Sequence, residues 1–207
     1  MFEQINDLKE HEQTDPLRLE EVKVILLKDK FQRDPIIVDK GTKVVIDGHH
    51  RLNALKILGY SKVAVHHVNY FNDERIIVKT WYPLLIGSRK KLMKLLYDKI
   101  ENVQSKRNPK LYGEFIIKNR IYSLKVRREI VMQSVLGEFR VEYAFTSKFA
   151  RRLALNGKIA GAFIFKSITK KDVIDRALAE KKYPPKTTQH IIPNKPRMWY
   201  VPLRELR

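Results

Sequence analysis

Five consecutive residues combine a carboxylate, a glycine and three nitrogen-bearing side chains in the segment Asp47-Gly48-His49-His50-Arg51. Histidine and arginine donate hydrogen bonds that suit a phosphate, and an aspartate can hold a metal ion or a proton. A glycine lets the backbone approach a ligand closely. The segment, here called the central loop, therefore predicts phosphate binding. The alternative is a hydrogen-bonded turn whose histidines cap a helix or lie in solvent.

The residues on either side predict a strand that leads into a helix. Segment 44–46 is a β-branched apolar run typical of a buried strand, and Leu52, Leu55 and Leu58 recur at helical spacing. Free backbone N–H groups and the helix dipole favour an anion at the start of such a helix. The central loop thus lies where a phosphate is best bound.

A second carboxylate, Glu12, lies in a polar loop just before another predicted helix. Pro16 suits the first turn of that helix, and Asp15 suits its N-cap. The helix must pack on the same sheet as the central loop, so Glu12 is positioned to accept a proton from a substrate hydroxyl. The alternative is a solvated surface glutamate.

Two further segments carry groups that can contact a small substrate. Trp81 stands at the end of a predicted strand, where it either stacks on a ligand or is buried where two lobes meet. A proline-flanked run near the C-terminus offers an ammonium, two hydroxyls, an amide and an imidazole, which can hold a carboxylate or phosphate or can be ordinary turn residues: Lys186, Thr187, Thr188, Gln189 and His190.

The remaining pattern predicts an α/β protein. Apolar periodicity predicts a helix from Pro16, a hairpin of segments 36–38 and 43–46, and strands at 62–68 and 75–81. The pattern changes near residues 83–87. Beyond that point we expect a basic amphipathic helix from Leu92 to Ile100, a hairpin around residues 118–119, helices at 127–136 and 147–155, strands at 139–145 and 159–165, and a helix that begins with a capping box at 169–172.

The composition excludes several kinds of chemistry. The chain has no cysteine, which rules out disulfides, thiolate metal sites and cysteine nucleophiles. No stretch is apolar enough to cross a bilayer, and the N-terminal residues do not resemble a signal peptide, so we expect a cytoplasmic protein without a membrane partner. The formal charge of +19 indicates either a polyanionic partner such as nucleic acid or a solvated surface rich in lysine and arginine.

Four segments together resemble the free-serine-kinase branch of the ParB/sulfiredoxin-like fold family. They agree in order and rough spacing and extend over nearly the whole chain: His11-Glu12-Gln13, the central loop, Thr80-Trp81-Tyr82-Pro83 and Pro185–His190. The resemblance implies transfer of a phosphoryl group from ADP or ATP to the hydroxyl of free L-serine. The product would be O-phospho-L-serine for cysteine or related biosynthesis.

The resemblance also implies roles for individual residues. Glu12 would take the proton of the serine hydroxyl, and Asp47 would be a second catalytic carboxylate near Mg²⁺. The nucleotide phosphates would be bound by Gly48, His49, His50 and Arg51. Serine and its phosphate would be surrounded by Trp81, Lys186, Thr187, Thr188, Gln189 and His190. Gln189 departs from the arginine expected in the tail motif, so the charge and the bidentate fork of arginine are lost there.

The expected organisation is a ParB/sulfiredoxin-like catalytic lobe over residues 1–85 and a mixed helix–sheet lobe over 86–182. A tail over 183–207 would return to the first lobe. The alternative function is a ParB-like nucleic-acid-binding protein without kinase activity, which leaves Glu12 and Asp47 unexplained and lacks a visible helix-turn-helix segment. A sulfiredoxin-like reaction would need a cysteine where His49 or His50 stands. Both ADP and ATP remain open as donors.

Overall fold

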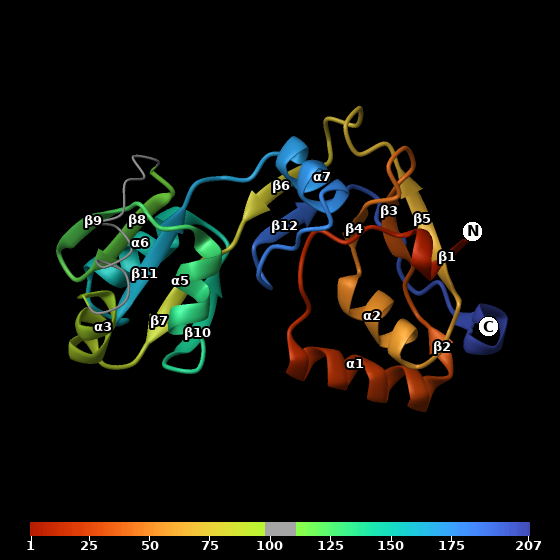
Figure 1. Cartoon of the computed structure of the whole chain (residues 1–207), viewed down its shortest axis with the longest axis horizontal. Helices are drawn as coiled ribbons and strands as arrows, with labels where there is room; N and C mark the ends of the chain where they lie inside the picture. The colour runs from red at the N-terminus through yellow and green to blue at the C-terminus, as the bar shows by residue number, and fades with distance from the viewer. Residues whose placement is uncertain (98–110) are drawn as a thin grey trace. The chain divides into compact units, whose positions relative to one another are not determined.

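The computed structural model describes residues 1–97 and 111–207, which divide into two units (Figure 1). The first unit combines residues 1–79 with residues 168–207, and the second contains residues 80–167. Both units contain helices and strands, as expected for an α/β chain. Ile100 of the expected amphipathic helix lies outside the described residues, and the described part of that helix is α3 (Arg89–Leu95).

A four-stranded sheet forms the centre of the first unit, in the order β1-β5-β3-β4. Strands β3 and β5 are parallel, and the outer pairs are antiparallel. The predicted hairpin and the predicted strand at 62–68 are both present. The elements are β1 (Phe2–Gln4), η1 (Ile5–Asp7), α1 (Pro16–Asp29), β2 (Phe31–Gln32), β3 (Ile36–Asp39), β4 (Val45–Asp47), α2 (His49–Ile57), β5 (Lys62–Val68), β6 (Ile77–Thr80), α7 (Lys170–Leu178), β12 (Thr188–Ile191), β13 (Val201–Pro202) and η3 (Leu203–Leu206).

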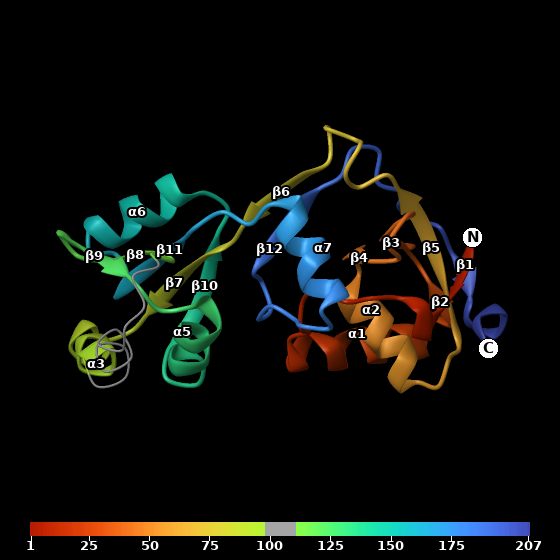
Figure 2. The same ribbon diagram turned by 45° about the horizontal axis from the view of Figure 1, so that its top comes forward.

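Helices cover both faces of this sheet, because successive strand residues point to opposite sides. Ile36 and Val38 of β3 pack in one apolar cluster with residues of α1 and α2, which lie side by side in Figures 1 and 2. Ile37 packs in a second cluster with Val173 and Ile174 of α7. A strand buried on both faces has little freedom to shift, so β4 delivers the central loop to a fixed position.

The second unit contains a five-stranded antiparallel sheet in the order β10-β7-β11-β8-β9. Its apolar residues pack in two clusters, one on the side of α3 and α5 and one on the side of α6. The elements are β7 (Tyr82–Ile86), α3, β8 (Gly113–Ile117), β9 (Arg120–Leu124), α5 (Arg128–Val135), β10 (Arg140–Ala144), α6 (Ser147–Leu155) and β11 (Gly161–Phe165).

The helix starts follow the caps that the sequence indicates. Asp15 caps α1 by accepting a hydrogen bond from Arg18 N at 2.9 Å. Thr169 and Asp172 form the expected capping box of α7. At α6 the cap is Thr146, and Ser147 is the first helical residue. No helix in the described part of the chain is long and apolar enough to span a membrane.

The unit boundaries differ from the expected ones at residues 85 and 182. The second unit ends at Ser167, and α7 belongs to the first unit. The reason is packing: Val173, Ile174 and Ala177 complete the apolar cluster that covers Ile37 and Ile46. Local sequence predicts that α7 is a helix, but it does not indicate which sheet the helix covers.

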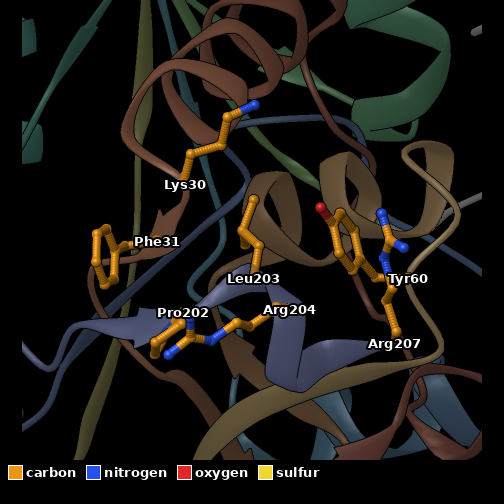
Figure 3. Close-up of a pocket in the computed structure, with 7 residues that line it drawn as sticks. All are labelled: Lys30, Phe31, Tyr60, Pro202, Leu203, Arg204 and Arg207. Carbon is orange, nitrogen blue, oxygen red and sulfur yellow. The ribbon is translucent and has the colours of Figure 1, made fainter.

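A cavity of about 540 Å³ lies in the first unit where η3 meets the end of α1 (Figure 3). Leu203 N donates a hydrogen bond to Lys30 O at 3.0 Å, which ties the two segments together. The cavity shares no lining residue with the central loop. Its lining is cationic, aromatic and apolar: Lys30, Phe31, Tyr60, Pro202, Leu203, Arg204 and Arg207.

Candidate active site

The central loop joins β4 to α2 as predicted. Gly48 is the residue before the helix, with φ of 106°, and His49 is the first helical residue. This backbone conformation turns the chain sharply enough for α2 to start directly after the strand. The free N–H groups of its first turn therefore stand next to Asp47, where an anion is favoured.

Gly48 is required for space as well as for conformation. A Cβ at this position would lie 3.0 Å from Arg51 Nη2 and 3.2 Å from Ile36 Cγ1. We expect Gly48→Ala to lower the free energy of unfolding by about 2–4 kcal/mol, because strain and overpacking add. Urea titration followed by circular dichroism measures this loss.

Gly59 is the matched control for Gly48. It also has a positive φ, of 79°, but a Cβ there meets nothing within 4 Å. Gly59→Ala should therefore cost only the backbone strain, about 1–2 kcal/mol. Equal losses for the two variants would show that Arg51 and Ile36 do not restrict the position of Gly48.

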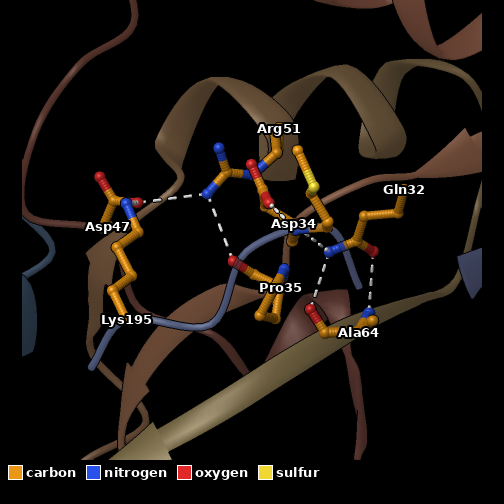
Figure 4. A network of polar contacts seen from close by, with 8 residues as sticks. Gln32, Asp34, Pro35, Asp47, Arg51, Ala64 and Lys195 are labelled. Carbon is orange, nitrogen blue, oxygen red and sulfur yellow. Dashed lines mark hydrogen bonds and ion pairs between the residues drawn. The ribbon is translucent and has the colours of Figure 1, made fainter. Parts of the chain in front are cut away.

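Asp47 is held by two cations. Its Oδ2 accepts hydrogen bonds from Lys195 Nζ at 2.6 Å and from Arg51 Nη2 at 3.2 Å, and Arg51 Nη2 also donates to Pro35 O at 3.3 Å (Figure 4). Burial raises the pKa of Asp47, but the charges and hydrogen bonds of Arg51 and Lys195 outweigh it and the net pKa is lowered. Asp47 is therefore an ionised carboxylate with little tendency to take up a proton.

Lys195 binds Asp47 directly but was not identified from the sequence, because 148 residues separate the two. The only local signal is its place in Pro193-Asn194-Lys195-Pro196, a segment with restricted backbone freedom. The following residues are also fixed, since Met198 N donates to Asp34 Oδ1 at 2.8 Å. Lys195 and Met198 thus attach this C-terminal segment to Asp47 at the end of β4 and to Asp34 just before β3.

Glu12 is held by the tail. Its Oε1 accepts a hydrogen bond from Lys186 N at 2.9 Å, and its Oε2 accepts from Thr188 N at 2.8 Å and Thr188 Oγ1 at 2.7 Å. The backbone is paired as well: Tyr183 N donates to His11 O at 2.8 Å, and Gln13 N donates to Tyr183 O at 2.9 Å. The Glu12 loop and the tail, far apart in sequence, therefore form one structure.

Three histidine rings lie close together next to the Glu12 loop. The ring of His11 lies 4.5 Å from that of His49 and 5.5 Å from that of His190, measured between centroids. Burial lowers the pKa of His11 to about 4 and that of His190 to about 3, and it lowers the pKa of His49 well below the usual value. All three are neutral near pH 7, so they bring no positive charge to a phosphate.

Several of the predicted site residues have structural partners. His50 Nε2 accepts a hydrogen bond from Asp15 N at 3.0 Å, which fixes the start of α1. Thr187 is fully buried and donates to Pro184 O at 2.7 Å, which closes the proline turn. His190 Nε2 forms a hydrogen bond of 2.8 Å with the hydroxyl of Tyr70, a partner that the sequence did not indicate.

Trp81 belongs to the second unit, where its ring lies 4.5 Å from that of Phe145 between centroids. The structure brings together residues of the other three segments, all within the first unit. The expected contact between Trp81 and serine therefore stays a prediction from the sequence.

Unsatisfied polar atoms in the described part of the chain concentrate in the predicted site. Three buried side-chain atoms there have neither a hydrogen bond nor an ion pair: His49 Nε2, Arg51 Nε and Gln189 Oε1. Buried polar atoms are rarely left without a partner, because losing water without replacement costs about 1–3 kcal/mol. These three atoms are therefore candidates for contact with a bound ligand.

Several known proteins resemble this chain over nearly its whole length. No family model matches the chain. It is 33% identical to the ATP-dependent L-serine kinase of Staphylothermus marinus, over 98% of this chain and 89% of that protein. The chain belongs to the L-serine kinase family. A second member, the ADP-dependent L-serine kinase of Thermococcus kodakarensis, is 28% identical over 100% of this chain and 92% of its own.

The fold of this L-serine kinase family member agrees with a solved structure. A free serine kinase in complex with AMP superposes with a TM-score of 0.84 at 24% identity, covering 100% of this chain and 93% of that one. The α/β class expected from the sequence is confirmed. The structural likeness extends over both units.

Proposed function

We propose that this protein transfers a phosphoryl group from ADP or ATP to the hydroxyl of free L-serine. In the reaction a bond forms between the serine oxygen and phosphorus. The bond from phosphorus to the departing nucleotide, AMP or ADP, breaks. The proton of the serine hydroxyl must leave, and a carboxylate is needed to accept it. The products are O-phospho-L-serine and the shorter nucleotide.

One observation carries the proposal: the chain is 33% identical to an ATP-dependent L-serine kinase over 98% of its residues. The structure adds that the loop of Glu12, the start of α2 and the tail lie in one unit. The unsatisfied atoms support it. Arg51 Nε is a donor that suits a phosphate oxygen, whereas Gln189 Oε1 is an acceptor. An acceptor suits the ammonium or hydroxyl of serine. Gln189, which stands where the family motif has arginine, therefore favours contact with those groups over contact with an anion.

We assign the role of base to Glu12 and a holding role to Asp47. Asp47 is bound to Lys195 and Arg51 and has a lowered pKa, which makes it a poor proton acceptor. It orients the two cations beside the start of α2. Those cations and the N–H groups of the helix start can then neutralise the charge of the transferred phosphoryl group.

Mg²⁺ fits this site only as an ion that arrives with the nucleotide. The described residues contain no cluster of three or more histidine, cysteine or acidic side chains suited to a metal. One carboxylate together with phosphate oxygens and water is a usual environment for Mg²⁺, and Asp47 provides that carboxylate. A bound Mg²⁺ would neutralise charge on the phosphates.

The direct test incubates the protein with L-serine, Mg²⁺ and either ADP or ATP. We expect ³¹P NMR to show O-phosphoserine in at least one arm, with AMP formed from ADP or ADP formed from ATP in equal amount. Removing Mg²⁺ with EDTA should abolish product. If neither nucleotide yields phosphoserine, the proposed function is wrong.

Donor choice is read from the same experiment. The two relatives carry the names of an ATP-dependent and an ADP-dependent enzyme. Comparing kcat/KM for ADP and ATP at equal Mg²⁺ concentration shows which nucleotide is the better phosphoryl donor. Product that persists without Mg²⁺ would exclude the metal from the reaction but not the kinase activity.

A further inference from the structure

The hydroxyl of Thr188 lies between Glu12 and His11. Its Oγ1 is 2.7 Å from Glu12 Oε2 and 3.0 Å from His11 Nε2. On its other side, the His11 ring meets the backbone, with Nδ1 2.8 Å from Val45 O. His11 is fully buried. These contacts form a continuous chain from the carboxylate of Glu12 to the backbone of β4.

The hydrogens in this chain can be counted. A backbone carbonyl only accepts hydrogen bonds, so His11 Nδ1 must carry a hydrogen and donate it to Val45 O. A neutral imidazole carries one hydrogen, which leaves His11 Nε2 as an acceptor only. The Thr188 hydroxyl has a single hydrogen. It can satisfy Glu12 or His11, but not both at once.

The protonation state of Glu12 decides the direction of this hydrogen. When Glu12 is ionised, the hydroxyl donates to its charged Oε2, which is the stronger acceptor. When Glu12 is protonated, its own O–H can donate to Thr188 Oγ1. The Thr188 hydroxyl can then rotate and donate to His11 Nε2. Every donor and acceptor in the chain has a partner in the protonated state.

We propose that His11 and Thr188 are positioning residues that stabilise the protonated form of Glu12 through rotation of the Thr188 hydroxyl. The inference rests on the proposed function in taking Glu12 as the acceptor of the serine proton. That proton ends on Glu12 and stays there until product leaves. His11 itself stays neutral throughout. Thr188 thus acts on the base, which differs from the substrate contact expected from the sequence.

Other titratable or charged groups face this chain from each neighbouring element, and none of them replaces His11 as the acceptor. They are His49 from α2, His190 from β12, Lys182 just before the tail, Lys186 within the tail, and Asp47 from β4. The two neighbouring histidines contact His11 through their ring edges. Because both histidines are neutral, they add no positive charge to that of the lysines near Glu12.

The first experiment uses the protein without substrate and therefore does not depend on kinase activity. Histidine is labelled with ¹⁵N, and the His11 resonances are followed by NMR as pH is lowered. We expect the Nδ1–H tautomer and, above about pH 5, where His11 is still largely neutral, the onset of an Nε2 shift as Glu12 begins to take up a proton. The coupled shift should vanish in Thr188→Val and Glu12→Gln and persist in Thr188→Ser. An Nε2–H tautomer, or the same shift in Thr188→Val, would overturn the inference.

The second experiment measures activity. His11→Asn keeps a donor near Val45 O but lacks an acceptor at Nε2, so it weakens only the protonated state of Glu12. We expect the acid limb of the kcat–pH profile to move down by about 0.5–1 pH unit, the equivalent of one hydrogen bond. His11→Gln, whose amide oxygen reaches the Nε2 position, should restore part of this shift. A lower kcat with an unmoved acid limb in His11→Asn would mean that His11 only supports the fold.

These outcomes separate the two proposals. If the wild-type protein makes no phosphoserine, the proposed function fails, and the NMR titration still decides whether the Thr188 hydroxyl couples Glu12 to His11. If phosphoserine forms but neither the His11 signal nor the acid limb responds, the kinase stands and the coupling is wrong.

Discussion

Glu12→Gln is expected to lower kcat for phosphoserine formation by about 10²–10⁴-fold. Glutamine has nearly the same shape as glutamate but cannot accept a proton near neutral pH. Its amide oxygen can still accept from Thr188, while its NH₂ group would face Lys186 N, which donates to Glu12 Oε1 in the native protein. We therefore expect a small loss of stability and a large loss of kcat, with little change in the KM for nucleotide.

Glu10→Gln is the matched control. Glu10 is another partly buried carboxylate two residues away, but its oxygens accept hydrogen bonds from Lys182 Nζ and Asn53 Nδ2. Removing that charge alters an ion pair outside the proposed reaction, so kcat should stay within the same order of magnitude. Steady-state kinetics and urea titration on both variants provide the comparison. A Glu12→Gln enzyme with wild-type kcat would remove Glu12 from the role of base.

Acidification is expected to destabilise the protein steeply below pH 6.5. The pKa of His11 is about 4 and that of His190 about 3 in the folded protein, both lowered chiefly by burial from the usual 6.5. As the pH falls, these histidines therefore take up protons in the unfolded chain at a higher pH than in the folded protein. The stability contributed by these neutral histidines is complete above pH 6.5 and is lost as pH falls towards the folded values.

The size of this destabilisation follows from the slope of the unfolding free energy against pH. Each such histidine costs about 1.4 kcal/mol for every pH unit below 6.5, so two of them cost on the order of 5 kcal/mol by pH 4.5. That is comparable with the whole stability of many domains. Carboxylates with lowered pKa, such as Asp47 and Glu3, add to the loss only at lower pH, since their contribution disappears below the ordinary carboxyl pKa.

Urea unfolding at several values between pH 7.5 and 5 measures this slope. His190→Gln tests the origin of this slope, because the glutamine amide can still form a hydrogen bond with the Tyr70 hydroxyl but does not titrate. The variant should show a slope smaller by about 1.4 kcal/mol per pH unit. Identical slopes in the variant and the wild-type protein would show that His190 does not contribute to acid sensitivity.

Much of the local structure is contained in short-range patterns. The strand and helix on either side of the central loop follow from a β-branched run and from leucines at helical spacing. The capping residues of α1 and α7 identify where those helices start. Such features depend on neighbours within a few residues, so one sequence suffices to predict them. The four segments that resemble the serine kinases were also visible in the sequence.

The sequence by itself thus determined the fold class, the family and the type of residue available in each segment of the site. Only the tertiary structure decided which partners those residues meet and how deeply they are buried. Glu12 meets the Thr188 hydroxyl 176 positions away, Lys195 neutralises Asp47, and burial rather than residue type makes His11 and His190 neutral. Partners and burial arise when distant segments pack together, and a pKa depends on both, so no local pattern contains them.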